Sequence, residues 1–288
     1  MTDQADILRK RFQEIYQQNH QKTLAVISGK GGVGKSNFSL NFSLSLLKKG
    51  HSVLLMDMDI GMGNIDILMG IHSKFTIVDY FENKASFSDI INEGPQGIHY
   101  IAGGSGLSDF VHMGQETMDR FFHEFTLFLN QYDYVLFDMG AGISNDSLHF
   151  ILSVDEVIIL TTPEPTSITD AYAAMKFIYL HKKDIPFYIV VNRIISAKEG
   201  RDTFQKLKYV LARFLEKDAI SLGMIPDDQQ VLQAVRKQVP FIIFNEKSIA
   251  AKALFELTDR YCKQLFSDSA QKSKTHFVTK LKRFLFER

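Results

Sequence analysis

The sequence predicts an α/β fold in which helices cover both faces of a doubly wound, mostly parallel β-sheet. Apolar runs of strand length recur along the chain with helical patterns between them, an alternation typical of parallel sheets. The runs do not alternate with polar residues, which indicates strands that are buried on both faces. The expected strands are residues 23–28, 52–56, 98–102, 134–137, 157–160, 187–191 and 219–223.

A glycine-rich loop follows the first expected strand, and a helix expected over residues 36–49 follows the loop and ends at Gly50. The loop begins at Gly29 and fits the phosphate-binding pattern G-x-x-x-x-G-K-[ST]. In such loops backbone N–H groups surround a chain of phosphates, the lysine reaches the phosphates and the final hydroxyl binds Mg²⁺. The residues expected to bind a nucleotide are Gly31, Gly32, Val33, Gly34, Lys35 and Ser36, with Ser36 also a Mg²⁺ ligand.

Carboxylates follow two further strands, at the edge of a parallel sheet where ligands bind. Asp57 and Asp59 follow the strand at 52–56, and Asp138 follows the strand at 134–137. Phosphoryl transfer depends on charge compensation and an oriented water more than on covalent chemistry, so these carboxylates are candidate catalytic groups. We expect Asp138 to hold Mg²⁺ and Asp57 to support the Mg²⁺ shell. Either Asp57 or Asp59 could instead merely cap the helix that follows.

The composition narrows the class of protein. Lys and Arg together number 33 in 288 residues, and so do Asp and Glu, so the total charge gives no reason to expect nucleic acid as a partner. Cys262 is the only cysteine, which favours a reducing compartment. Residues 1–22 lack the apolar core of a signal peptide, and no stretch approaches a membrane span. We expect a cytoplasmic protein that can associate peripherally with a membrane.

Lys30 adds a second lysine to the loop, and the spelling Lys-Gly-Gly-x-Gly-Lys-Ser resembles the deviant phosphate-binding loop of the MinD/ParA/nitrogenase-reductase family. The resemblance implies a P-loop ATPase that forms a homodimer when it binds ATP. It also implies that Lys30 crosses the dimer interface and touches the nucleotide of the other subunit. One cysteine per chain disfavours the iron–sulfur members of the family, whose dimers need two ligating cysteines per subunit.

Two further loops resemble the switches of that family. The segment from Asp57 to Asp66 is similar to switch I, in which Asp59 would position the attacking water. Residues 138–142 are similar to switch II, in which the Gly142 N–H would sense the γ-phosphate without a side chain in the way. The resemblance therefore makes Lys30, Lys35, Asp59 and Asp138 the expected catalytic residues.

Two loops are candidates for recognition of adenine. Asn192 follows the strand at 187–191 and offers both a donor and acceptors to a base edge. In relatives a proline–acid loop packs on the base, which implies that role for Pro226 and Asp227, and Glu164 would touch either the ribose or the other subunit. The guanine-specific pattern N-K-x-D is absent from the sequence. We therefore expect ATP or ADP with Mg²⁺, in preference to GTP.

The chain ends in a basic, aromatic tail in which apolar residues recur at helical spacing on one face. Such a helix suits an anionic membrane interface, and a dimer that carries two would bind far better than one chain. The helix could instead dock on the core of the protein itself, and the two states could alternate. The expected membrane contacts are Phe277, Leu281, Phe284, Leu285, Lys280 and Arg283.

The first nine residues carry a second resemblance. The opening D-Q-A-x-x-L-R looks like that of the FlhG family (also called FleN or YlxH), the MinD-like ATPases that govern flagellar number and placement. In that family the segment binds and activates the flagellar signal-recognition-type GTPase FlhF, and the resemblance implies flagellar basal-body switch components as further partners. The implied contacts with the GTPase are Gln4, Ala5, Leu8 and Arg9.

We expect four parts: an N-terminal partner-activating extension (1–20), a MinD-like ATPase domain (21–266), a linker (267–275) and an amphipathic membrane-targeting helix (276–288). The expected protein is a slowly hydrolysing ATP switch that dimerises with ATP, binds the membrane and regulates flagella through the GTPase. Two alternatives stay open. A MinD-type division-site regulator would share the membrane switch but not the first nine residues, and a ParA-type partition ATPase would need a basic DNA-binding surface on its dimer.

Overall fold

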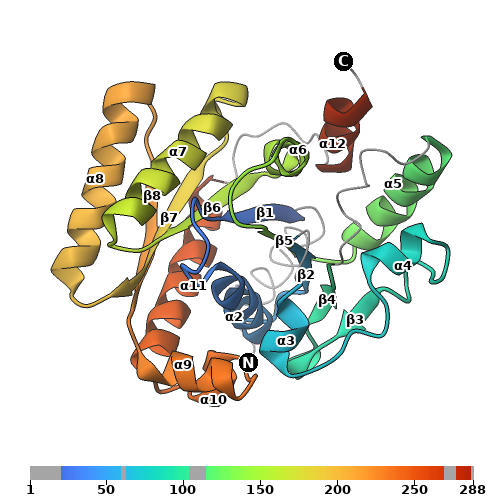
Figure 1. Cartoon of the computed structure of the whole chain (residues 1–288), viewed down its shortest axis with the longest axis horizontal. Coiled ribbons are helices and arrows are strands. Elements are labelled where there is room, and N and C mark those ends of the chain that lie inside the picture. The colour runs from blue at the N-terminus through green and yellow to red at the C-terminus, as the bar shows by residue number, and fades with distance from the viewer. Residues whose placement is uncertain (1–20, 60–62, 104–114, 269–276, 287–288) are drawn as a thin grey trace, which may run out of the picture.

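A computed structural model describes residues 21–59, 63–103, 115–268 and 277–286 of the chain. Its centre is a sheet of eight strands in the order β3-β4-β2-β5-β1-β6-β7-β8 (Figure 1). All neighbouring strands are parallel except β3 and β4. The strands are β1 (Lys22–Ile27), β2 (Val53–Met58), β3 (Ile91–Glu93), β4 (His99–Ile101), β5 (Tyr134–Met139), β6 (Glu156–Thr161), β7 (Phe187–Ile194) and β8 (Ile220–Pro226).

Every predicted strand is confirmed, with ends that shift by at most three residues. The sequence did not predict β3, an antiparallel strand at the edge of the sheet. Its three residues include Asn92 and Glu93, and none is fully buried. A strand this short and polar lacks the apolar run that identified the others, because its side chains are not buried on both faces of the sheet.

Helices cover the two faces of the sheet in two layers, each around its own apolar core (Figure 1). One layer includes α5 (Gln115–Leu129), α6 (Asn145–Ser153), α7 (Pro165–His181), α8 (Ala197–Leu215) and α12 (Phe277–Phe286). The other includes α2 (Lys35–Lys48), α3 (Ile65–Met69), α9 (Gln229–Arg236), α10 (Phe241–Phe244) and α11 (Ile249–Asp268). The short α4 (Ile77–Phe81) packs against α5, and a 3₁₀ turn (Pro95–Gly97) joins β3 to β4.

The C-terminal helix α12 is docked on the core, packed against α5 and α6. The Phe277 ring stacks on Phe137 of β5 with 4.9 Å between centroids, and Leu281 is fully buried. Lys280 Nζ lies 3.1 Å from Asp155 Oδ1, and Lys282 Nζ lies 3.3 Å from an oxygen of Asp119. In this structure the tail is therefore docked on its own protein, which is one of the two predicted alternatives. In this state Phe277 and Leu281 cannot reach a membrane.

A largely buried polar network lies at the N-terminal ends of the central strands β1 and β6. Tyr261 of α11 is fully buried, and its hydroxyl donates a 2.7 Å hydrogen bond to Glu156 Oε2 at the start of β6. Lys22 Nζ of β1 lies 2.5 Å from Glu156 Oε1. Burial and the adjacent carboxylate raise the pKa of the Tyr261 hydroxyl, so it stays a donor. The network ties α11 to the two central strands.

Replacing Tyr261 by Phe should therefore destabilise the fold by about 1–3 kcal/mol, because one buried oxygen of Glu156 loses its donor. The measurement is the free energy of unfolding in urea. Tyr209→Phe is the control, since Tyr209 is exposed and its change should cost at most about 0.5 kcal/mol. Equal stabilities of the two variants would contradict the assignment.

Candidate functional site

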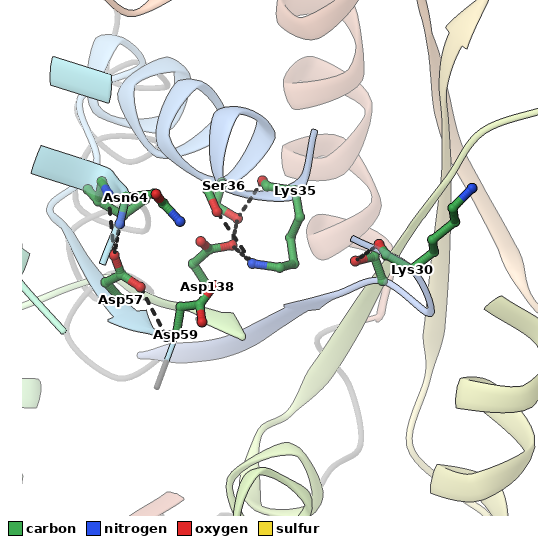
Figure 2. Close-up of polar contacts among 10 residues, drawn as sticks. Lys30, Lys35, Ser36, Asp57, Asp59, Asn64 and Asp138 are labelled. Carbon is green, nitrogen blue, oxygen red and sulfur yellow. Dashed lines mark hydrogen bonds and ion pairs between the residues drawn. The ribbon is translucent and has the colours of Figure 1, made fainter. Parts of the chain in front are cut away.

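The predicted site residues gather where the parallel strands end. Asp138 of β5 pairs in register with Asp57 of β2 on one side and with Val26 of β1 on the other. The glycine-rich loop follows the end of β1 at Ile27 and leads into α2. Figure 2 shows Lys35, Ser36, Asp57, Asp59 and Asp138 at this edge. The sheet therefore brings together residues that lie up to 103 positions apart in the sequence.

The backbone of the loop is shaped to hold an anion. Gly32 and Gly34 adopt left-handed conformations, with φ of 79° and 93°. Helix α2 starts at Lys35, and its first turn has neither a side-chain cap nor an acidic residue. Its first N–H groups and its dipole are therefore free to face a phosphate. At Gly29 a Cβ would lie 2.1 Å from the backbone of Asp170, so only glycine lets the loop pack against α7.

A buried ion pair occupies the centre of the site. Lys35 Nζ lies 2.8 Å from Asp138 Oδ1, and both side chains are almost entirely buried. The Ser39 hydroxyl donates a 2.8 Å hydrogen bond to the same oxygen. Ser36 Oγ lies 3.4 Å from Lys35 Nζ. Ser39 was not among the predicted site residues, although Ser39, Asn41, Ser43 and Ser45 alternate with apolar residues in the sequence, an unusual pattern for a helix, and all four are buried.

Mg²⁺ fits the residues present. The second carboxylate oxygen of Asp138 is buried, and no described group donates a hydrogen bond to it. An orphaned buried oxygen is costly unless a ligand satisfies it. Together with the Ser36 hydroxyl it supplies hard oxygen donors of the kind that Mg²⁺ prefers. Asp138 and Ser36 are therefore the residues that would hold the ion.

Asp57 holds the chain that follows β2. One carboxylate oxygen accepts a 3.0 Å hydrogen bond from the Asp59 N–H, and the other accepts hydrogen bonds from the N–H groups of Asn64 and Ile65 at the start of α3 (Figure 2). Burial and the neighbouring Asp138 raise the pKa of Asp57 to about 6. The capping alternative therefore describes Asp57 in this structure, and its support of a Mg²⁺ shell stays a prediction.

Asp59 lies beside switch II. The side chain is half-buried, and its Oδ1 would lie 3.6 Å from a Cβ placed on Gly140. No described group donates a hydrogen bond to the Asp59 carboxylate, so its oxygens are available to orient a water. Gly142 has a φ of 80°, and its N–H points to the carbonyl of Ser28 at 3.4 Å. In this structure the Gly142 N–H is therefore directed at the protein's own backbone, and the roles of Asp59 and Gly142 remain predictions.

The expected adenine loops lie next to each other. Asn192 pairs with Ile225, the residue before Pro226, across β7 and β8, and the Asp227 N–H donates to the Ile194 carbonyl at 3.0 Å. The amide nitrogen of Asn192 donates a 2.9 Å hydrogen bond to the carbonyl of Val33 in the glycine-rich loop. Asn192 therefore positions the phosphate loop, a contact that the sequence analysis did not anticipate.

Lys30 is separate from this cluster. Its side chain is exposed and points away from Lys35 and Asp138 (Figure 2). Its Nζ lies 3.2 Å from Glu164 Oε2 and 3.4 Å from Thr166 Oγ1, at the start of α7. Within one chain, Lys30 therefore does not take part in the group around Asp138. Its contact with Glu164 also gives that acid a partner that the sequence analysis did not consider.

These features define a class of protein. A glycine-rich loop between a central strand and a helix, with Lys35 and Ser36 at its end and Asp138 on the neighbouring strand, is the site of a P-loop nucleotide-binding protein.

Comparisons with known proteins specify the family. The family model of ParA, described as NUBPL iron-transfer P-loop NTPase, matches residues 19–262. The antiactivator FleN of Pseudomonas aeruginosa is 35% identical over 243 residues, which cover 83% of this chain and 87% of FleN. The flagellum site-determining protein YlxH of Helicobacter pylori is 36% identical over 75% of this chain and 74% of YlxH. The chain therefore belongs to the ParA/MinD family of P-loop ATPases, which hydrolyse ATP.

A solved structure confirms the fold. MinD of Pyrococcus horikoshii, in complex with Mg-ADP, superposes with a TM-score of 0.69 at 22% identity, covering 88% of this chain and all of that one. The ligand Mg-ADP is that of the Pyrococcus protein, and the likeness shows the fold of this chain. No helix in the described part of the chain is long and apolar enough to cross a membrane. The GTPase contacts predicted at Gln4, Ala5, Leu8 and Arg9 lie outside the described residues.

The raised pKa of Asp57 predicts a pH dependence. Because its pKa is about 6 in the folded chain and 3.8 as the ordinary value, the native state binds a proton more tightly than the unfolded chain between these limits. The free energy of unfolding, measured without Mg²⁺, should fall as the pH rises from about 4 to 6, by up to about 3 kcal/mol.

Asp57→Asn should remove this component of the pH profile, whereas Asp59→Asn should keep it, since the pKa shift belongs to the buried Asp57 carboxyl. Unfolding in urea at a series of pH values measures both variants. A profile of Asp57→Asn that matches the unmodified chain would contradict the assignment.

Proposed function

We propose that this chain is an ATP-driven switch of the FlhG type that regulates the number or placement of flagella. The observation that carries the proposal is the separation of two lysines: Lys35 lies buried on Asp138, whereas Lys30 lies exposed at the mouth of the loop. The relatives FleN and YlxH are named an antiactivator and a flagellum site-determining protein. Their similarity favours a flagellar role over the division-site and DNA-partition alternatives.

In the proposed cycle the residues around β1 and β5 do the chemistry. Bound Mg²⁺ would neutralise charge on the phosphates, with Ser36 and Asp138 as its protein ligands. The N–H groups of Gly31, Gly32, Val33 and Gly34 would hold the phosphate oxygens, and Lys35 would leave Asp138 to contact them. Asp59 would orient the attacking water, and the Gly142 N–H would face the γ-phosphate. Asn192, Pro226 and Asp227 would bound the base.

Lys30 would complete the site of a second subunit. Among the described residues, the polar contacts of its Nζ are with Glu164 and Thr166, and the Glu164 side chain is 61% exposed. An exposed ion pair contributes at most about 1 kcal/mol, so Lys30 can exchange Glu164 for a phosphate at little cost. A cation that enters from the other subunit would make hydrolysis depend on dimer formation.

Lys30→Ala should therefore keep nucleotide binding but lose the ATP-dependent dimer and lower ATP hydrolysis at least about 100-fold, since a trans-acting cation contributes this much or more in related phosphoryl transfer. Lys48→Ala is the matched control, because Lys48 is equally exposed and also pairs with one glutamate. Light scattering and phosphate release are the measurements. Wild-type hydrolysis in Lys30→Ala would rule out the trans role.

The docked helix α12 would be the resting state of the membrane tail. Undocking exposes Phe277, Val278 and Leu281, which costs about 1.5–3 kcal/mol for each side chain. The ion pairs of Lys280 and Lys282 are partly exposed and add little. A single chain should therefore keep the helix docked, and release would need an anionic membrane to take up the same apolar face and the two helices of an ATP dimer to act together.

The chain should sediment with vesicles of phosphatidylcholine and phosphatidylglycerol in ATP but not in ADP, and a version that ends at Ala270 should not sediment. Phe284→Ser is the sharper variant, because Phe284 is 37% exposed in the docked state and its loss should weaken vesicle binding without opening the core. Vesicles of phosphatidylcholine alone are the control. If the chain does not sediment with the vesicles in ATP or in ADP, the proposed membrane binding is wrong.

Residues 1–20 would activate an FlhF-type GTPase, and flagellar basal-body switch components would be further partners. Deleting residues 1–20 should abolish stimulation of that GTPase, and Gln4→Ala with Arg9→Ala should reduce it, while the chain's own nucleotide binding is unchanged. The GTPase turnover rate is the measurement. Full stimulation of the GTPase by the shortened chain would contradict the FlhG assignment and favour a division-site regulator. ATP-dependent retention of the chain on DNA would favour the partition ATPase.

A further inference from the structure

Exposed apolar side chains lie near the C-terminal ends of α7 and α8, far from the site. Leu180 is 64%, Tyr209 59% and Phe214 63% exposed. The two helices are neighbours in one layer (Figure 1), and Lys217 after α8 donates a 2.7 Å hydrogen bond to the carbonyl of Lys183 after α7. Single exposed apolar residues are ordinary, but several at one end of a layer indicate an interaction surface.

Arg213 is held between the two rings. Its NH1 donates a 2.6 Å hydrogen bond to the Tyr209 hydroxyl, and its guanidinium lies 5.8 Å from the centroids of both Tyr209 and Phe214. Arg213 forms no ion pair with any described residue. Arg213 is thus ordered by aromatic rings and has no carboxylate partner in the described part of the chain. Arginine and tyrosine are enriched among the residues that contribute most to binding at protein interfaces.

The surrounding charge is basic, although the whole chain has balanced charge. Residues 176–184 and 206–218 contain seven Lys and Arg and three Asp and Glu. The acids are Asp184, Glu216 and Asp218, and Asp218 already pairs with Lys208. Lys176 and Lys206, one turn before Leu180 and Tyr209, have no ion pair among the described residues. The charge that complements this surface is therefore negative.

The surface is also remote from the nucleotide. Helix α7 begins beside Lys30 and runs 17 residues, about 25 Å at 1.5 Å per residue, to its last turn. A dimer formed through the mouths of the phosphate loops would leave this end uncovered. The group defined by Leu180, Tyr209, Arg213 and Phe214 thus stays accessible in either state of the proposed switch.

We infer that this α7–α8 surface binds a partner protein through an acidic segment that carries at least one large apolar side chain. The apolar anchor would lie against Leu180 and Phe214, and a carboxylate of the segment would pair with Arg213. A phosphate backbone or a lipid headgroup would satisfy the cations, but a phosphate backbone would leave the exposed apolar side chains unused. The inference does not depend on nucleotide binding, so it stands or falls separately from the proposed function.

The test selects ligands from a random twelve-residue peptide library displayed on phage, with the full chain as the target. The double variant Arg213→Glu, Phe214→Ser serves for counter-selection, and both positions are exposed enough for the variant to fold, which its unfolding curve verifies. Selected peptides should contain Asp or Glu together with Leu, Ile or Phe. Measured by fluorescence anisotropy, their affinity should fall at least about tenfold in the double variant.

Two controls make the result specific. Leu127→Ser on α5 removes an apolar side chain of similar exposure outside the surface and should leave peptide binding unchanged. Exchanging the peptide's acids for lysine should abolish binding to the unmodified chain and restore it to Arg213→Glu. The inference would be overturned if the selected peptides lacked acids or bound the double variant with equal affinity. It would also be overturned if the chain bound anionic vesicles or duplex DNA instead of peptides and the double variant lost that binding.

Discussion

The buried ion pair between Lys35 and Asp138 is the interaction on which the site depends. It joins the helix after the phosphate loop to the neighbouring strand β5, with Ser39 as a third partner. Removing two charges from water is costly, and the cost is offset only if each is well paired. Here one oxygen of Asp138 is paired and the other is orphaned. The pair therefore orders the loop, and a Mg²⁺ ion would supply the partner that the second oxygen of Asp138 lacks.

The remaining parts of the site are arranged around this pair. Asp57 lies in register with Asp138 and ties down the chain after β2 through three backbone N–H groups. Helix α7 starts against Gly29 and Lys30, and α6 starts three residues after Gly142 and supports α12. Switch II thus leads into the helix that supports the docked tail, and the phosphate loop packs against the helix that carries part of the α7–α8 surface. This continuity is the physical route by which the proposed switch would act beyond the nucleotide.

The sequence predicted those features whose cause is local or repeated along the chain. Seven strands were recognisable because burial on both faces requires continuous apolar runs, and the loop was recognisable because glycines at fixed spacing precede Lys35. β3 escaped because an edge strand of three residues needs no such run. The contacts of Asn192 with Val33, of Ser39 with Asp138 and of Lys30 with Glu164 were not predictable, because each joins segments brought together only by the sheet. The docked position of α12 was left open, since an amphipathic face suits a protein core as well as a membrane.

A crystal structure with Mg²⁺ and a non-hydrolysable ATP analogue would test the central claim most directly. The claim is that Lys35 and Asp138 pair with each other only in the absence of ligand. When the nucleotide binds, a phosphate replaces Asp138 as the partner of Lys35, and Mg²⁺ replaces Lys35 as the partner of Asp138. The account predicts that Lys35 Nζ leaves Asp138 for the phosphates and that the orphaned oxygen of Asp138 faces the Mg²⁺ shell. A Lys35–Asp138 contact that stays at its present 2.8 Å with the analogue bound would contradict it.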